Sequence, residues 1–193
     1  MKLPLLPIAG LIVALGACSS VTVSNAWKDP AWSGPPADSV LVVGITRSDT
    51  MRRVFEDTFS QQLQAAGIKA SASYTQIPAG AGASVQLGTL IKSSGAQAVL
   101  ATRVQRVETK INVTPSGPGY GRFYGWYGSA WASTPDVSQY DVVTLETSVW
   151  DAKTENLVWT VTTQAVATNN IPKATTQLAQ TLIPKLKADG ILR

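Results

Sequence analysis

Residues 39–67 read SVLVVGITRSDTMRRVFEDTFSQQLQAAG. Residues 39–45 are a continuous apolar run rich in β-branched side chains, which is typical of a strand buried on both faces of a sheet. The residues that follow carry apolar side chains at three- and four-residue spacing, which predicts a helix with one buried face. This helix should begin at Ser48 or Asp49, whose side-chain oxygens can accept from free backbone N–H groups, and end at Gly67. Its buried face is expected to hold Met51, Phe55, Phe59 and Leu63, with Val54 and Ala66 beside them.

Charged residues of the same helix are expected to pair on its solvent side. Arg52 and Glu56, like Arg53 and Asp57, have the four-residue spacing at which opposite charges attract. Glu56 and Asp57 are adjacent on the helix and therefore point apart. Solvation of the helix and charge balance near its N-terminus explain these two carboxylates without a catalytic role.

The chain after Gly67 continues the alternation of strands and helices. A polar turn separates the last two strands, which predicts a hairpin. The first half of the long strand is expected to be buried and its second half to be half-exposed. The expected elements are a strand at 68–77, a short helix at 84–94 closed by Gly95, a long strand at 96–113, and strands at 140–150 and 157–166.

A last helix is expected to follow the hairpin. Asn169 or Asn170 can cap it, and Pro172 is tolerated in its first turn. Pro184 should kink or interrupt it, because proline lacks a backbone N–H and crowds the preceding turn. The element order is then β-α-β-α-β-β-β-α. This order predicts an α/β (α+β) fold with a single mixed β-sheet and helices packed on it.

The first residues resemble the leader of a bacterial lipoprotein. An apolar run follows Met1-Lys2 and ends in Leu15-Gly16-Ala17-Cys18, which resembles a lipobox. The run is shorter than the roughly 20 apolar residues that a membrane-spanning helix needs. The resemblance implies a signal peptide at 1–17, cleavage before Cys18, and acylation of Cys18 with palmitate among the acyl groups. Ser19 after the cysteine implies an outer-membrane protein that faces the periplasm.

Composition excludes several kinds of site. The 193 residues include one cysteine and no histidine, and the net charge is +4. The lone cysteine leaves no intramolecular disulfide. Without histidine there is no Ser-His-Asp triad and no histidine metal ligand, so no metal or cofactor is expected. The positive excess is small and the basic residues are scattered, which argues against nucleic acid as a partner.

Residues 18–38 are expected to form a lipidated, extended tether, and residues 39–193 a single periplasmic domain. The tether contains several Pro and Ser residues and has no sustained periodicity. A short edge strand before Trp27 is compatible with the alternating valines there. Trp27 and Trp32 either settle at the membrane interface or pack on the domain, and packing is the preferred interpretation.

The predicted element order resembles that of the amino-terminal domain of TolB. It also looks like the periplasmic domains of the curli secretion lipoprotein family and of the lipoprotein activators of penicillin-binding proteins. The resemblance covers about residues 39–193, and it rests on element order and the lipobox rather than on a diagnostic motif. It implies a non-catalytic role in the envelope, and Cys18 is the one functional residue that it carries over.

Residues 114–138 form a long segment in which aromatic residues alternate with glycines. Loops of this length are uncommon in compact domains and tend to be either functional or disordered. Tyr and Trp supply large contact areas with a polar edge, which suits a glycan, a lipid surface or a protein groove. Alternatively, the aromatic residues cover an edge of the protein's own sheet, or the loop merely extends the hairpin. The candidate partner-binding residues are Tyr120, Arg122, Phe123, Tyr124, Trp126, Tyr127 and Trp131.

Three functions are compatible with these features. The first is a non-catalytic, lipid-anchored accessory or assembly module that binds a periplasmic protein or peptidoglycan and forms homo-oligomers through sheet edges. The second is a glycan- or lipid-binding module that uses the aromatic loop. The third is an envelope hydrolase in which Glu108 and Glu146 form a carboxylate pair. Exposed strand carboxylates are far more often only solvated, so no catalytic residue is assigned.

Overall fold

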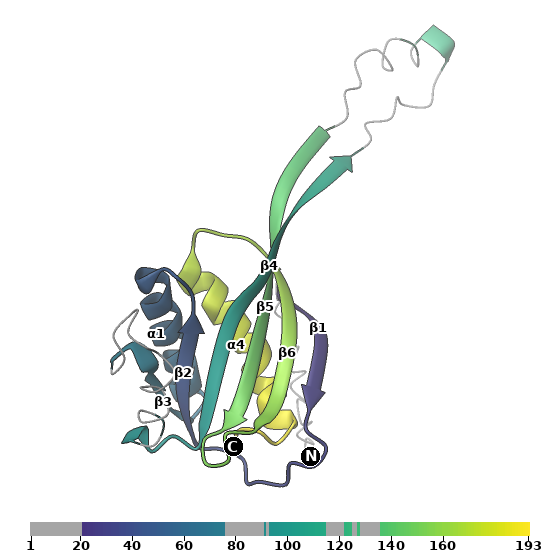
Figure 1. The fold of residues 1–193 in the computed structure, drawn as a ribbon. Coiled ribbons are helices and arrows are strands. Elements are labelled where there is room, and N and C mark those ends of the chain that lie inside the picture. The colour runs from purple at the N-terminus through teal and green to yellow at the C-terminus, as the bar shows by residue number, and fades with distance from the viewer. Residues whose placement is uncertain (1–20, 76–90, 92, 115–121, 125–126, 128–135) are drawn as a thin grey trace, which may run out of the picture.

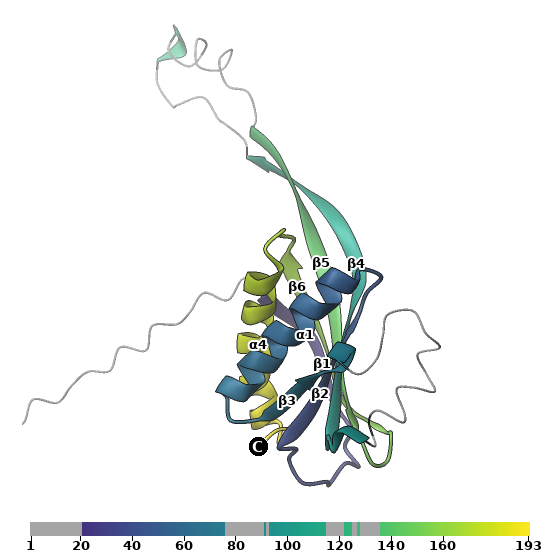
Figure 2. The ribbon, with the colours of Figure 1, turned by 90° about the vertical axis from the view of Figure 1, so that its left-hand side faces the viewer.

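The computed structural model describes residues 21–75, 91, 93–114, 122–124, 127 and 136–193. Over these residues the chain forms one six-stranded sheet with two long helices packed on one of its faces (Figures 1 and 2). The elements are β1 (Val21–Lys28), β2 (Ser39–Ile45), α1 (Asp49–Ala65), β3 (Lys69–Ala72), the short 3-10 helix η1 (Ser73–Thr75), β4 (Ala98–Thr114), β5 (Asp136–Asp151), β6 (Leu157–Val166) and α4 (Ile171–Ala188).

The sheet is mixed, and its strands lie in the order β1-β6-β5-β4-β2-β3. β2 is parallel to both β3 and β4. The pairs β4–β5, β5–β6 and β6–β1 are antiparallel. α1 forms the crossover from β2 to β3, because parallel neighbours need a long connection. The predicted fold class, a single mixed sheet with helices packed on it, is confirmed.

Element boundaries differ from the predictions at three places. β3 is shorter than the strand predicted at 68–77, because the chain turns into η1 after Ala72. β5 begins at Asp136, so the end of the predicted loop belongs to a strand. Of the helix predicted at 84–94, residues 91, 93 and 94 are helical, and the others lie outside the described residues. Gly95 follows with a φ of +67°, as a helix-ending glycine should.

The short edge strand that the sequence allows before Trp27 is present as β1, within the segment expected to be a tether. β1 pairs with β6 along its whole length, from Val21 opposite Ala165 to Lys28 opposite Trp159. Residues 29–38 then run past the ends of the central strands to β2 (Figure 1).

The two tryptophans of that segment differ in their surroundings. Trp32 packs against the core, and the ammonium group of Lys28 lies 5.6 Å from the centre of its ring. The side chain of Trp27 is 46% exposed. Packing on the domain is therefore the correct interpretation for Trp32, whereas Trp27 faces solvent.

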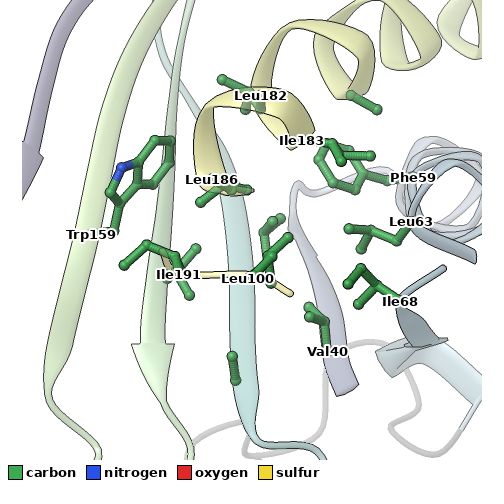
Figure 3. Packing of buried hydrophobic residues seen from close by; sticks show 14 of the residues in the cluster. Val40, Phe59, Leu63, Ile68, Leu100, Trp159, Leu182, Ile183, Leu186 and Ile191 are labelled. Carbon is green, nitrogen blue, oxygen red and sulfur yellow. The ribbon is translucent and has the colours of Figure 1, made fainter. Parts of the chain in front are cut away.

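The core lies between the sheet and the two helices (Figure 3). Burying a large apolar side chain stabilises the fold by roughly 1.5–3 kcal/mol. The predicted apolar stripe of α1 supplies part of this core, although Met51 at its start is exposed. Fully buried residues that face one another across the layers are Phe59 and Leu63 of α1, Leu182 and Leu186 of α4, and Leu100 and Trp159 of the sheet.

Helix α1 begins and ends as predicted, but one of its ion pairs does not lie in solvent. The side chain of Ser48 caps the helix, and Gly67 follows it with a φ of +85°. Arg52 pairs with Glu56 at 3.0 Å, yet the side chain of Glu56 is fully buried. The prediction of a solvent-side pair is wrong, because Glu56 shares the helical face of Phe59.

Helix α4 begins at the predicted cap and continues past its internal proline. The side chain of Asn170 accepts a hydrogen bond from the N–H of Lys173, and Pro172 lies in the first turn. Pro184 lies inside the helix, which runs on to Ala188. The predicted interruption at Pro184 is therefore absent.

Candidate functional site

β4 and β5 extend beyond the rest of the sheet (Figure 1). β2 pairs with β4 only as far as Arg103, and β6 pairs with β5 only from Val142 onward. Residues 104–114 of β4 and 136–141 of β5 therefore each lack a neighbouring strand on one side. These two segments are called the arm, and residues 109–114 and 136–141 pair only with each other.

A β-bulge determines which side chains of the arm share a face. The register of β4 against β5 shifts at Gln105, which is the extra residue of the bulge. Side chains alternate between the two faces along a strand, and the bulge adds one residue to β4. The odd-numbered residues of β4 that follow Gln105 therefore lie on the same face as the even-numbered residues that precede it. The apolar residues that thereby share the helix-covered face of the buried Leu100 are Val107, Ile111 and Val113 of β4, together with Val137 opposite Val113.

Past the two helices this face of the arm is uncovered (Figure 2). The exposed fractions are 57% for Val107, 62% for Ile111, 53% for Val113 and 57% for Val137. These four residues are called the apolar face. Thr109 and Asp141 lie among them and satisfy each other, because the hydroxyl of Thr109 donates a 2.7 Å hydrogen bond to the carboxylate. Gln139 also lies on this face, opposite Ile111, so polar residues interrupt the apolar ones. Exposed apolar side chains gathered on one face are typical of a contact site.

The opposite face of the arm is charged. Glu108 lies between two basic residues of its own strand. One carboxylate oxygen is 3.5 Å from Nε of Arg106, and the other is 3.6 Å from Nζ of Lys110. These three residues are called the charged face, and the arm is thus a two-stranded ribbon with two chemically different sides.

Four of the seven predicted partner-binding residues belong to the part of the chain that the structure describes, and all four are exposed. Phe123 is 65%, Tyr124 87% and Tyr127 51% exposed. The ring of Phe123 lies 5.6 Å from that of Tyr124 and 5.9 Å from that of Tyr127. With Arg122, these residues are called the tip, which lies beyond the end of the arm (Figure 1). The described tip residues do not cover the edge of the sheet but lie beyond the ends of β4 and β5.

The remaining predicted site residues fall outside the described residues. They are Tyr120, Trp126, Trp131 and the lipidation candidate Cys18.

The carboxylate pair considered for hydrolysis is not assembled. Glu108 lies opposite Val142 and Glu146 opposite Arg103, so the two positions are four residues apart along β5. That is roughly 13 Å of backbone separation at the rise of a strand, and Glu108 is held by its own basic neighbours, Arg106 and Lys110. Glu146 instead accepts hydrogen bonds of 3.1 and 3.0 Å from the guanidinium of Arg103, and this raises the pKa of Arg103.

A buried polar cluster at Glu56 is the main feature that the sequence analysis missed. Oε1 of Glu56 accepts from the N–H of Gly44 at 2.8 Å, from Nε of Arg52 at 3.0 Å and from the hydroxyl of Ser73 at 2.9 Å. Oε2 accepts from the N–H of Tyr74 at 2.8 Å. Both oxygens are thus occupied by protein donors, so the cluster is structural. Its sequence signal was the spacing of Glu56 relative to Phe59 and Leu63, which puts all three on one helical face.

The second predicted ion pair of α1 is replaced by two other contacts. Nε of Arg53 pairs with Asp49 at 2.7 Å instead of with Asp57. Asp57 accepts a hydrogen bond of 2.8 Å from the hydroxyl of Tyr74. This hydrogen bond, with partial burial and the charge of Asp57, raises the pKa of Tyr74. Tyr74 therefore stays protonated and acts as a donor at neutral pH.

A cavity of about 540 Å³ lies at the end of the sheet opposite the arm. Its lining is mostly apolar and includes Trp32, Val149 and Ile191. Asp151 also lines it, but Oδ1 of this residue accepts from Thr154 and from the N–H of Lys153 in the β5–β6 turn. Ligand pockets usually combine apolar walls with several convergent polar groups. This cavity is thus a weaker candidate than the arm.

The described residues contain neither a metal-binding cluster nor a membrane-spanning helix. No group of three or more Asp, Glu, His or Cys side chains is arranged to hold a metal ion. None of the described helices combines the length and the apolar character needed to span a bilayer.

Solved structures with a similar fold come from bacteria. PelC from Paraburkholderia phytofirmans, solved as a dodecamer, is 18% identical, with a TM-score of 0.47 over 90% of this chain and 99% of that chain. Lipoprotein GNA1162 from Neisseria meningitidis is 14% identical, with a TM-score of 0.41 over 78% of this chain and 98% of that chain. At these identities and TM-scores, the similarities say nothing about what this chain binds.

Sequence comparison places the chain in a family. No curated protein gives a significant match. The predicted resemblance to TolB and the curli secretion lipoproteins stays a prediction. Residues 27–186 match the family model described as a domain of unknown function, DUF4136. Because this match spans most of the chain, the protein belongs to the DUF4136 family.

Proposed function

We propose that the protein is a non-catalytic, lipid-anchored protein of the bacterial outer membrane that faces the periplasm and acts as an accessory or assembly module. In this proposal, lipid on Cys18 holds the domain at the membrane. The arm and its tip bind a further component of the envelope, either a periplasmic protein or peptidoglycan.

The arm is the observation that carries this proposal. It projects from the sheet, its apolar face is more than half exposed, and the tip presents exposed aromatic rings. Aromatic side chains with a polar edge are enriched where proteins contact partners. Arg122 adds a positive charge beside these rings.

The absence of catalysis is supported by the chemistry of the sequence and by the register of the sheet. The chain has no histidine, and Glu108 and Glu146 lie four positions apart along the register, each paired with basic residues. Self-association through the outer edges of β1 and β3 stays a prediction.

The second candidate function is a lipid- or glycan-binding module. The lipid version is favoured by one observation: the first described residue, Val21, lies beside the base of the arm. A chain anchored just before Val21 has its arm near the bilayer.

Crosslinking in intact cells tests the first candidate. A photoreactive residue at Tyr124, which is 87% exposed, is compared with one at the exposed Lys153 at the opposite end of the sheet. The first candidate predicts one protein, or peptidoglycan, crosslinked from Tyr124 and not from Lys153. Crosslinks to lipid alone would support the second candidate. Identical patterns from both positions would contradict any role of the tip.

A further inference from the structure

The arm projects from the end of the sheet at which the described chain begins. Val21 lies opposite Ala165, which lies opposite Val143 beside the base of the arm. Cys18 precedes Val21 by three residues, which span at most about 11 Å. From Val143 to Asp136 the arm extends for seven residues, or roughly 24 Å. Lipid on Cys18 therefore holds the domain by the end that carries the arm, and the arm is longer than the chain that separates the lipid from the fold.

The two faces of the arm suit an interface between water and lipid. The apolar face is 53–62% exposed, and it continues the side of the sheet that the helices cover elsewhere. The charged face pairs Glu108 with Arg106 and Lys110 and keeps its hydration when it points to water. A ribbon of two strands is marginally stable in water on its own. Burial of the apolar face against lipid would stabilise it.

The edges of the arm limit how deeply it can enter. Residues 109–114 and 136–141 have no strand beyond either side, so backbone N–H and C=O groups along both edges need water. Unsatisfied backbone groups are costly in hydrocarbon. The arm can therefore lie along the interface, as amphipathic helices do, but it cannot enter the hydrocarbon core alone.

The tip fits the same location. Phe123, Tyr124 and Tyr127 are each at least half exposed. Tyr124 and Tyr127 carry a hydroxyl on an apolar ring, and such rings are enriched at the level of lipid headgroups. Arg122 can contact headgroup phosphates from the same position.

We propose that the arm is a second membrane contact: its apolar face and the tip lie in the headgroup interface of the bilayer that carries the lipid on Cys18. This inference rests on the lipidation of Cys18 in the proposed function. It develops the lipid version of the second candidate, in which the partner of the arm is lipid instead of a periplasmic protein or peptidoglycan. The two contacts restrict the orientation of the domain, and the β5–β6 turn lies at the end of the sheet opposite the arm.

Fluorescence quenching in vesicles tests the inference with the full lipidated chain. Because the single cysteine carries the lipid, a cysteine introduced as Tyr124→Cys is the one free thiol that an environment-sensitive dye can label. Vesicles of phosphatidylethanolamine and phosphatidylglycerol contain headgroup-level spin-labelled lipid as the quencher. We expect quenching at Tyr124 about threefold or more above that of a dye at Lys153→Cys. Equal quenching at both positions would overturn the inference.

A pair of matched variants distinguishes a contact through the apolar face from simple proximity. Ile111→Ser with Val113→Ser should lower quenching at Tyr124, because two apolar side chains are lost from the membrane-facing side. Lys110→Ser on the charged face should leave it nearly unchanged. Equal effects of the two changes would also overturn the inference. An unchanged circular dichroism spectrum and thermal unfolding midpoint exclude misfolding of the domain.

Separate measurements show whether the proposed function itself fails. Intact mass shows whether Cys18 carries lipid, and vesicle flotation shows whether the protein is anchored. An unlipidated, soluble chain contradicts the proposed function itself. A lipidated, anchored chain whose dye at Tyr124 is as accessible to water as the dye at Lys153 contradicts only the membrane contact of the arm.

Discussion

A single buried carboxylate, that of Glu56, joins three elements of the fold. It accepts hydrogen bonds from Gly44 of β2, from Arg52 of α1, and from Ser73 and Tyr74 of η1. Buried charges are tolerated when every lone pair has a donor. Glu56 therefore sets where β3 gives way to η1, because it holds the N–H of Tyr74 in place.

Replacing this carboxylate should lower the free energy of unfolding substantially. In Glu56→Gln the side-chain NH₂ group faces backbone N–H and hydroxyl groups that donated to the carboxylate. The change also leaves Arg52 without its charge partner. We expect a loss of roughly 3 kcal/mol in the free energy of unfolding, measured by urea denaturation. Asp49→Asn, which affects an exposed pair with Arg53, is the control and should cost less than about 1 kcal/mol. A Glu56→Gln loss no larger than that of the control would contradict the role assigned to the cluster.

Asp189 makes stability depend on pH. Partial burial alone would raise its pKa, but hydrogen bonds from Trp159 and Lys185 and the charges of Lys185 and Lys28 outweigh burial and lower it. A lowered carboxyl pKa stabilises the fold above the unfolded value, about 3.9, and this stabilisation is lost as pH falls through the folded pKa.

The corresponding variant is Asp189→Asn. Its hydrogen bond with the indole of Trp159 loses a charged acceptor, so we expect about 1 kcal/mol lower stability at pH 7. The gap between variant and wild type should shrink as pH falls below about 4. Urea denaturation at a series of pH values measures this gap. A gap that stays constant with pH would show that Asp189 does not titrate in this range.

At the scale of whole elements, glycines with positive φ fix where helices stop. Gly67 has a φ of +85°, and a Cβ added there would meet nothing within 4 Å. Gly67→Ala should therefore destabilise the protein through its backbone alone, by about 1–2 kcal/mol in thermal or urea unfolding. Gly67→Asn should cost less, because asparagine tolerates this conformation better. Equal losses for both variants would point to a cause other than the backbone angle.

The sequence predicts elements well where local signals agree. Ser48 and Gly67 mark both ends of α1, and the polar turn before Leu157 marks β6. β1 is harder to predict in full, because half of its residues are polar and its pairing with β6 is known only from the fold.

The candidate site was predictable only where local sequence signals mark it. The aromatic alternation marks the tip, but the apolar face of the arm depends on the bulge at Gln105. No residue type at that position signals a bulge, since its cause is the register between two strands far apart in sequence.

At the scale of the whole molecule, the proposed lipid on Cys18 would be joined to β1 by a short connection, whose length would set how closely the domain is held. Inserting about ten Gly and Ser residues between Ser20 and Val21 adds roughly 17 Å of average reach. We expect quenching of the dye at Tyr124 to fall about twofold or more, because the effective concentration of the arm at the bilayer drops. Lipidation and flotation should be unchanged. Undiminished quenching would mean that the arm binds lipid tightly without help from the anchor.

The antiparallel pairing of β1 with β6 also has a mechanical consequence. β1 runs from Val21 to Lys28 away from the end where the arm projects, and its hydrogen-bonded partners extend along the whole strand. A force applied ahead of Val21, along the strand, loads these bonds together in shear instead of opening them one after another. When the protein is pulled by its N-terminus, β1 should therefore resist separation from the sheet, because many hydrogen bonds must break at once. The single cysteine leaves no intramolecular disulfide to reinforce this attachment.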